Sequence, residues 1–179
     1  MKKGFYYIVA LLTVLLLWSC STKKNTKASR FYHAFTTRYN IYFNGKQAFD
    51  EALKSQQDGY KENYSDRIYM YPISAQPKDK AEPGGPFDRT IEKSNKAIKL
   101  HSKKPGWRNN PKLRAIQEQE EYNPFLKNSW LIMGQAQFYN ADFLQASATF
   151  SYIARHYAKD EEVVAEARLW QARCYSEMG

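Results

Sequence analysis

Cysteine and histidine are scarce in this chain of 179 residues, which has two cysteines and three histidines. Cys20 and Cys174 are too few to form a framework of disulfides. His33, His101 and His156 lie far apart in the sequence, and none pairs with Cys, Asp or Glu at the spacing of a metal-binding motif. The sequence therefore predicts neither a disulfide scaffold nor a metal site, and we expect no cofactor.

The sequence motifs of common enzymes are also missing. Gly84-Gly85 lacks the Gly-Lys-Ser/Thr continuation and the preceding strand of a phosphate-binding loop. Ser129 and Ser147 lack the glycine context of a nucleophile elbow. The glutamates between 118 and 121 are typical of a solvated helix face rather than of an acid/base pair. We therefore expect neither catalysis nor a small-molecule substrate.

No apolar run is long enough to span a bilayer. The longest, residues 5–18, is shorter than the stretch of about 18 or more residues that a spanning helix needs. It follows Lys2 and Lys3 and ends at Ser19 and Cys20. A charged start, a short apolar core and a small residue at the end are typical of a secretory signal.

The end of this signal resembles a bacterial lipobox, with Leu17, Ser19 and Cys20 in the expected order, although Trp18 replaces the usual small residue. We therefore expect lipidation of Cys20 and anchoring to the outer membrane. An ordinary cleaved signal peptide and an uncleaved anchor are the alternatives. Acidic residues often follow the cysteine in lipoproteins that are exported to the cell surface. Their absence from 20–29 favours an orientation facing the periplasm.

The remaining chain has a helical pattern interrupted by a loop. Residues 29–60 carry two apolar stripes separated by Asn44-Gly45, a break signal that predicts a helical hairpin. The first stripe is aromatic and is expected to be core, while Tyr32 and Tyr64 lie off it and could contact a glycan. The stripe comprises Phe31, Phe35, Tyr39, Tyr42 and Phe43. The predicted segments are a signal (1–19), a lipidated tether (20–28), the hairpin (29–60), a connector rich in proline and glycine (61–88), basic then charged helices (89–121) and repeats (122–179).

Residues 122–179 contain a repeated helical pattern. Asp142 can cap a second helix after the one that contains Trp130. Superposing 171–179 on 133–141 gives a period of about 38 residues, close to the period of about 34 residues in a tetratricopeptide repeat. The pattern resembles that repeat and predicts an all-α fold of helical hairpins, an α-solenoid. The signature residues are Trp130, Met133, Gly134, Phe138, Ala146, Phe150, Ala172, Tyr175 and Gly179.

The second copy of the repeat stops after its first helix. We therefore expect Trp170, Ala172 and Tyr175 to be exposed, and we expect the chain to be a fragment of a longer repeat protein. Cys174 falls in the apolar pattern of this helix and is expected to be a small buried core residue.

Charge is concentrated in the middle of the chain. The net charge is +9, and residues 89–114 hold nine basic side chains and one acidic one. This cluster is either a solvated face, a contact for a protein or anionic envelope lipid, or a nucleic-acid site; the signal disfavours the last. The candidate contact residues are Lys93, Lys96, Lys99, Lys103, Lys104 and Arg108.

Three stretches carry a more specific resemblance: "TTRYNIYFNG", "KPGWRNNPK" and "EEYNPFLKNSWLIMGQAQFY". With the lipobox, they resemble the N-terminal part of the SprE/PorW family of tetratricopeptide lipoproteins of Bacteroidetes. The resemblance implies a non-enzymatic scaffold that binds protein components of the type IX secretion and gliding motility machinery. A periplasmic lipoprotein that binds cell-wall glycan through its aromatic hairpin is the alternative.

Overall fold

The computed structural model describes residues 26–65, 68–69, 71–75, 85–102 and 121–179. Within these ranges the regular structure is entirely helical, with no strand. The signal, Cys20, the basic residues Lys103, Lys104 and Arg108, and nearly all of the charged segment before 122 lie outside the described residues.

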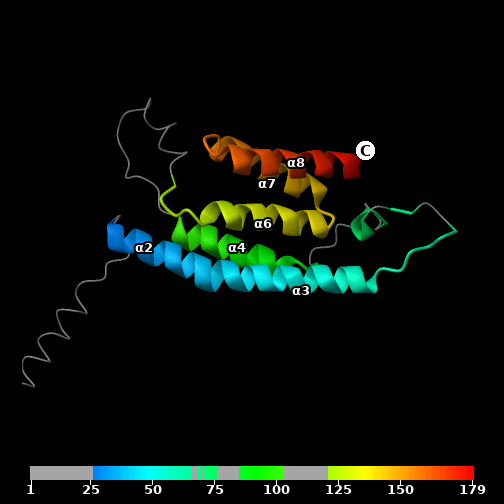
Figure 1. The fold of residues 1–179 in the computed structure, drawn as a ribbon, viewed down its shortest axis with the longest axis horizontal. Helices are drawn as coiled ribbons and strands as arrows, with labels where there is room; N and C mark the ends of the chain where they lie inside the picture. Colours follow the sequence, from blue (N-terminus) through cyan, green and yellow to red (C-terminus); the bar gives the residue numbers. More distant parts are fainter. Residues whose placement is uncertain (1–25, 66–67, 70, 76–84, 103–120) are drawn as a thin grey trace, which may run out of the picture.

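The first described element is one long helical rod (Figure 1). Helix α2 (Lys27–Thr36) begins after Thr26, whose hydroxyl accepts a hydrogen bond from the backbone N–H of Ser29 at 3.2 Å. A π-helical segment, η1 (Thr37–Tyr42), connects it directly to α3 (Phe43–Gly59). Because the three segments follow one another without a turn, the hairpin predicted for 29–60 is wrong.

The Asn44-Gly45 pair does not break the rod, because both residues have a role inside it. The Asn44 side chain donates to the carbonyl oxygen of Asn40 at 2.7 Å, one helical turn back. Gly45 is buried, and a Cβ at this position would lie 3.3 Å from the Cβ of Lys93 in the next helix. The Thr90 hydroxyl donates to the Gly45 carbonyl at 3.2 Å. The glycine therefore permits close helix packing rather than a turn.

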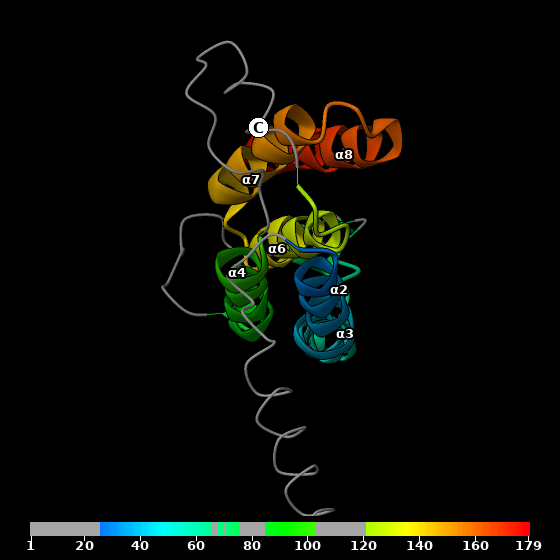
Figure 2. The ribbon, with the colours of Figure 1, turned by 90° about the vertical axis from the view of Figure 1, so that its left-hand side faces the viewer.

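The hairpins are formed by longer-range pairs. Helix α3 packs against α4 (Asp88–His101), α4 against α6 (Leu126–Tyr139), α6 against α7 (Phe143–His156), and α7 against α8 (Glu161–Met178). Alternate helices also touch, α3 with α6 and α6 with α8. Figure 2 shows the resulting stack, with α3 and α4 on one side of α6 and with α7 and α8 on the other. The predicted all-α fold of helical hairpins is confirmed, and the stack has the character of an α-solenoid.

The buried residues form three clusters between neighbouring helices. The largest joins α6, α7 and α8 around Phe138 and Phe150, and it includes Cys174, which is fully buried as predicted. It also includes Ile73 from the short 3-10 helix η2 (Pro72–Ala75), which lies in the predicted connector. The second cluster joins α3, α4 and α6, and the third joins η1, α4 and α6. Burying one large apolar side chain contributes about 1.5–3 kcal/mol to folding.

The aromatic stripe of the rod is mostly not part of this core. Phe31, Phe35, Tyr39 and Phe43 are exposed, and only Tyr42 packs against a core cluster. In α2 and η1 the buried face lies two positions away, and it consists of Ser29, His33, Thr37 and Ile41. Both sets repeat every four residues, so periodicity fits either face. In the structure the smaller and more polar set is buried, because these side chains allow α4 and the start of α6 to approach the rod.

Candidate functional site

The signature residues of α6 and α7 meet at one helix crossing. A Cβ on Gly134 would lie 2.7 Å from two ring atoms of Phe150, so this crossing requires the missing side chain. Ala146, Phe150 and Phe138 are fully buried, and Met133 is buried. Trp130 is half-buried, and its ring lies 4.5 Å from that of Tyr152 between centroids. The arrangement holds α7 tightly against α6.

Two residues that the sequence superposition pairs both have positive φ angles. Ala141, which ends the turn after α6, has φ of +61°, and Gly179, which follows α8, has φ of +97°. Both lie in the left-handed region that L-residues rarely adopt. The superposition predicted from the sequence pairs these two residues, and they share this conformation.

Helix α8 has an uncovered side, which we call the α8 outer face and define as Leu169, Ala172 and Tyr175. Leu131 of α6 is 7% exposed, whereas Leu169, its counterpart one period later, is 63% exposed. Ala172, the counterpart of Gly134, and Tyr175 are exposed as well. This face corresponds to the side of α6 that contacts α7.

Trp170 is partly buried, so the prediction that it is exposed was wrong. Its ring stacks on Phe150 with centroids 5.9 Å apart, and it contacts Phe138 edge-on at 5.4 Å. The guanidinium of Arg173 lies 4.1 Å from the centre of the Trp170 ring. Trp170 therefore faces the α6–α7 core, away from the α8 outer face.

The described basic residues of α4 that were predicted as contacts differ in exposure. Lys93 is half-buried at the crossing with Gly45, whereas Lys96 and Lys99 are exposed. Exposed Glu92 and Leu100 lie on the same helix. Of the predicted contact residues, Lys96 and Lys99 are therefore the exposed ones within the described ranges.

A buried polar junction, which the sequence did not predict, ties the rod to α4 and α6. The Nδ1 atoms of His33 and His101 lie 2.9 Å apart, and both rings are buried. The amide of Asn123 donates to the Thr37 hydroxyl at 2.9 Å and to the His101 carbonyl at 3.1 Å, and the Thr37 hydroxyl donates to the His33 carbonyl at 2.7 Å. A hydrogen bond between two ring nitrogens needs one donor and one acceptor, so at least one ring is neutral. The two histidines are 68 positions apart, and no local sequence pattern indicates that they are in contact.

Two titratable groups near α8 have shifted pKa values. Asp160 accepts from the N–H of Val163 at 3.3 Å and caps α8, and the Lys127 ammonium lies 2.7 Å from its other oxygen. The hydrogen bond from Lys127 is the main cause that holds the pKa of Asp160 below its usual value. Burial raises the pKa of the Cys174 thiol to about 11, so this thiol is poorly reactive.

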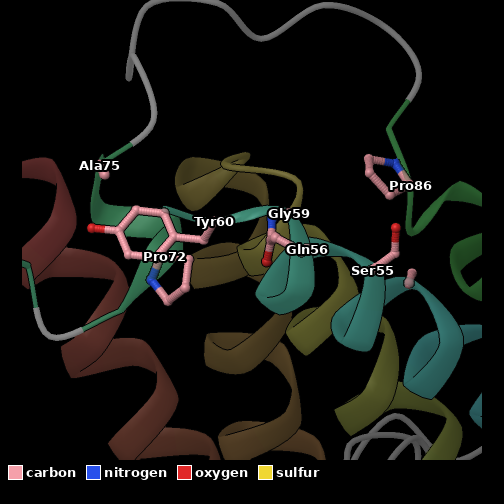
Figure 3. Close-up of a pocket in the computed structure, with 8 residues that line it drawn as sticks. Ser55, Gln56, Gly59, Tyr60, Pro72, Ala75 and Pro86 are labelled. Atoms are coloured by element: carbon pink, nitrogen blue, oxygen red, sulfur yellow. The ribbon is translucent and has the colours of Figure 1, made fainter. Parts of the chain in front are cut away.

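A shallow hollow lies where the end of α3 meets the connector. Ser55 and Pro86 lie at one end of it in Figure 3, and Tyr60, Pro72 and Ala75 lie at the other. Its lining has no charged side chain. The described residues also contain no group of three or more Cys, His, Asp or Glu side chains that could hold a metal ion. The exposed helix faces are therefore the candidate binding surfaces of the described residues.

Comparison with known proteins gives no identification. No protein-family model matches the chain, and no curated protein matches it in sequence. None of the described helices combines the length and the apolar character that crossing a membrane requires. The class defined by the fold is that of an all-α protein of stacked helical hairpins.

Proposed function

We propose that this chain is a non-enzymatic scaffold of tetratricopeptide type, anchored to the outer membrane through Cys20 and facing the periplasm. Its partners would be protein components of a type IX secretion and gliding motility machinery, as the resemblance to the SprE/PorW family implies. The stack of helical hairpins supports the scaffold proposal, and the α8 outer face is where a further helix, of this chain or of a partner, would pack.

Repeat geometry explains why this face suits a helical partner. At the equivalent position of α6, Gly134 lets the Phe150 ring approach to van der Waals contact. Ala172 is the small residue at that position on α8, and Leu169 and Tyr175 flank it as exposed apolar side chains. A helix that packs there would bury all three, in the way that α7 buries the equivalent side of α6. Apolar faces of this kind bind amphipathic helices in grooves and solenoids.

Site-specific crosslinking tests the proposal. A photoreactive residue at Leu169 or Tyr175 of the full chain should crosslink to proteins of the secretion and motility machinery in intact cells, identified by mass spectrometry. Leu144 is the matched control, because it is also an exposed apolar residue but lies on α7. Leu169→Arg should lower recovery of the same proteins at least several-fold, and Leu144→Arg should not. Equal recovery with the two variants would contradict a role for the α8 outer face.

A further inference from the structure

The rod carries an exposed row of rings, which we call the aromatic face and define as Phe31, Phe35, Tyr39 and Phe43. These side chains are 71%, 52%, 56% and 60% exposed. The rings of Phe31 and Phe35 stack with centroids 5.9 Å apart, and those of Phe35 and Tyr39 lie 4.8 Å apart. Single exposed apolar residues are ordinary, but four in one row, three of them with rings in contact, form a candidate interaction surface.

The sequence that carries the aromatic face has charged residues of one sign. No acidic residue precedes Asp50 in the sequence, and the described part of this stretch contains Lys27, Arg30, Arg38 and Lys46. The guanidinium of Arg38 lies 5.0 Å from the centre of the Tyr39 ring, so positive charge is placed at the aromatic face itself. Such a surface attracts anions over a distance of about 10 Å at 0.1 M salt.

The aromatic face ends where the charge becomes mixed. Beyond Phe43, the exposed residues of α3 include Asp50, Glu51 and Lys54. The exposed rings therefore lie in the part of the rod whose sequence has basic but no acidic residues, and they are absent from the part whose sequence has both. Aromatic rings combined with Lys and Arg on a helix are typical of contact with the interface of an anionic bilayer.

We propose that the aromatic face lies on an anionic lipid bilayer, with α2 and η1 parallel to the membrane surface and their rings among the headgroups. Helix α2 begins seven positions after Cys20, a span of at most about 25 Å. This proximity argument rests on the proposed lipidation, whereas the composition of the aromatic face does not. The rod lies on the opposite side of the stack from α7 and α8, so bilayer contact leaves the α8 outer face accessible (Figures 1 and 2).

Vesicle binding tests the proposal in the full chain carrying Cys20→Ser, which has no acyl chain. Vesicles contain phosphatidylcholine alone or with about 30% phosphatidylglycerol. Phe31→Gln, Phe35→Gln and Tyr39→Gln together should weaken partitioning into the anionic vesicles by roughly tenfold or more. The matched control replaces Leu144, Ile68 and Met178, which are 74%, 54% and 42% exposed and belong to neither face, with Gln and should bind like the parent. Binding of the parent should weaken as salt is raised from about 0.1 M to 1 M.

A positional probe separates the aromatic face from the apolar run at residues 5–18, which every variant retains. In the same background, Phe35→Cys and Leu144→Cys are each labelled with an environment-sensitive fluorophore, while the buried Cys174 stays unlabelled. Brominated lipids in the anionic vesicles should quench the label at position 35 and leave the label at position 144 unquenched. Circular dichroism verifies that each variant is folded.

Three results would overturn the proposal: equal quenching at the two positions, no quenching at position 35, or retention of the chain on purified sacculi through the aromatic face without vesicle binding. The last result would assign the face to cell-wall glycan instead. Because these chains are not acylated, the outcome does not depend on whether Cys20 is lipidated. Labelling of the native chain by a clickable fatty acid tests lipidation separately.

Discussion

Gly134 offers a sharp test of the packing between α6 and α7. In an isolated helix, Gly→Ala is stabilising by about 1 kcal/mol, because alanine has the higher helix propensity. Here a Cβ would lie 2.7 Å from the Cε1 and Cζ atoms of Phe150 and 3.2 Å from its Cδ1 atom. The Phe150 ring is fully buried and stacks against Trp170, so it has little room to move.

The expected effect of Gly134→Ala is the sum of these two opposing terms. Overpacking a close-packed core costs about 1–3 kcal/mol. With the gain in helix propensity of about 1 kcal/mol subtracted, we expect a net loss of up to about 2 kcal/mol in the free energy of unfolding. A loss of stability is the opposite of what helix propensity alone predicts.

Urea denaturation followed by circular dichroism measures the change, and a double-mutant cycle with Phe150→Leu assigns it. Leucine lacks the ring atoms that the Cβ would meet, so Gly134→Ala should cost less in that background, with a coupling energy of about 1 kcal/mol or more. Gly59→Ala is the control, because a Cβ at Gly59 has no neighbour within 4 Å, and it should not destabilise. A Gly134→Ala variant more stable than the parent, or strict additivity in the cycle, would refute the packing argument.

Two further perturbations follow from the polar contacts. Asp160→Ala removes the cap of α8 and should cost about 1 kcal/mol near neutral pH. Because the folded pKa of Asp160 lies below its usual value of 3.8, the difference from the parent should be largest above that value and disappear as the pH falls through the folded pKa; a difference that persists in acid would contradict the role of the carboxylate. Asn123→Ala leaves buried partners in the polar junction without their donor and should lower thermal and urea stability by about 1–3 kcal/mol, whereas Asn63→Ala at an exposed position should change it by less than about 0.5 kcal/mol. Equal stability of the two asparagine variants would mean that the junction does not hold the rod to α4 and α6.

Local patterns predicted the C-terminal helices well because their periodicity is unambiguous. The buried apolar residues Phe143, Ala146, Phe150 and Ile153 of α7 recur at steps of three and four. Asp142 caps the helix where the sequence indicates, accepting from the Gln145 N–H at 3.2 Å. Along the rod, apolar residues and small or polar residues share one spacing. The greater hydrophobicity of the aromatic residues led to the prediction that they form the core. In the structure, α4 and α6 instead pack against the small and polar residues of the rod.

The glycines show the same difference between local and tertiary information. Asn44-Gly45 and Gly134 look alike as weak points of a helix. In the structure, both glycines instead mark a close approach of a second helix. Gly134 belongs to a repeat pattern, which also predicts the partner helix. No such pattern accompanied Gly45, whose neighbour Lys93 belongs to a helix on the far side of the connector.

The sequence by itself determined the all-α class, the helical hairpin near its end and the burial of Cys174, because these follow from helical spacing and side-chain size within short segments. Only the tertiary structure decided that the first hairpin consists of the rod and α4, that His33 meets His101, and that the aromatic face is left open. These features depend on which surfaces fit together across dozens of residues, and local propensity contains no information about that fit. The polar junction occupies the inner side of the rod, and the rings of the aromatic face are therefore directed outward.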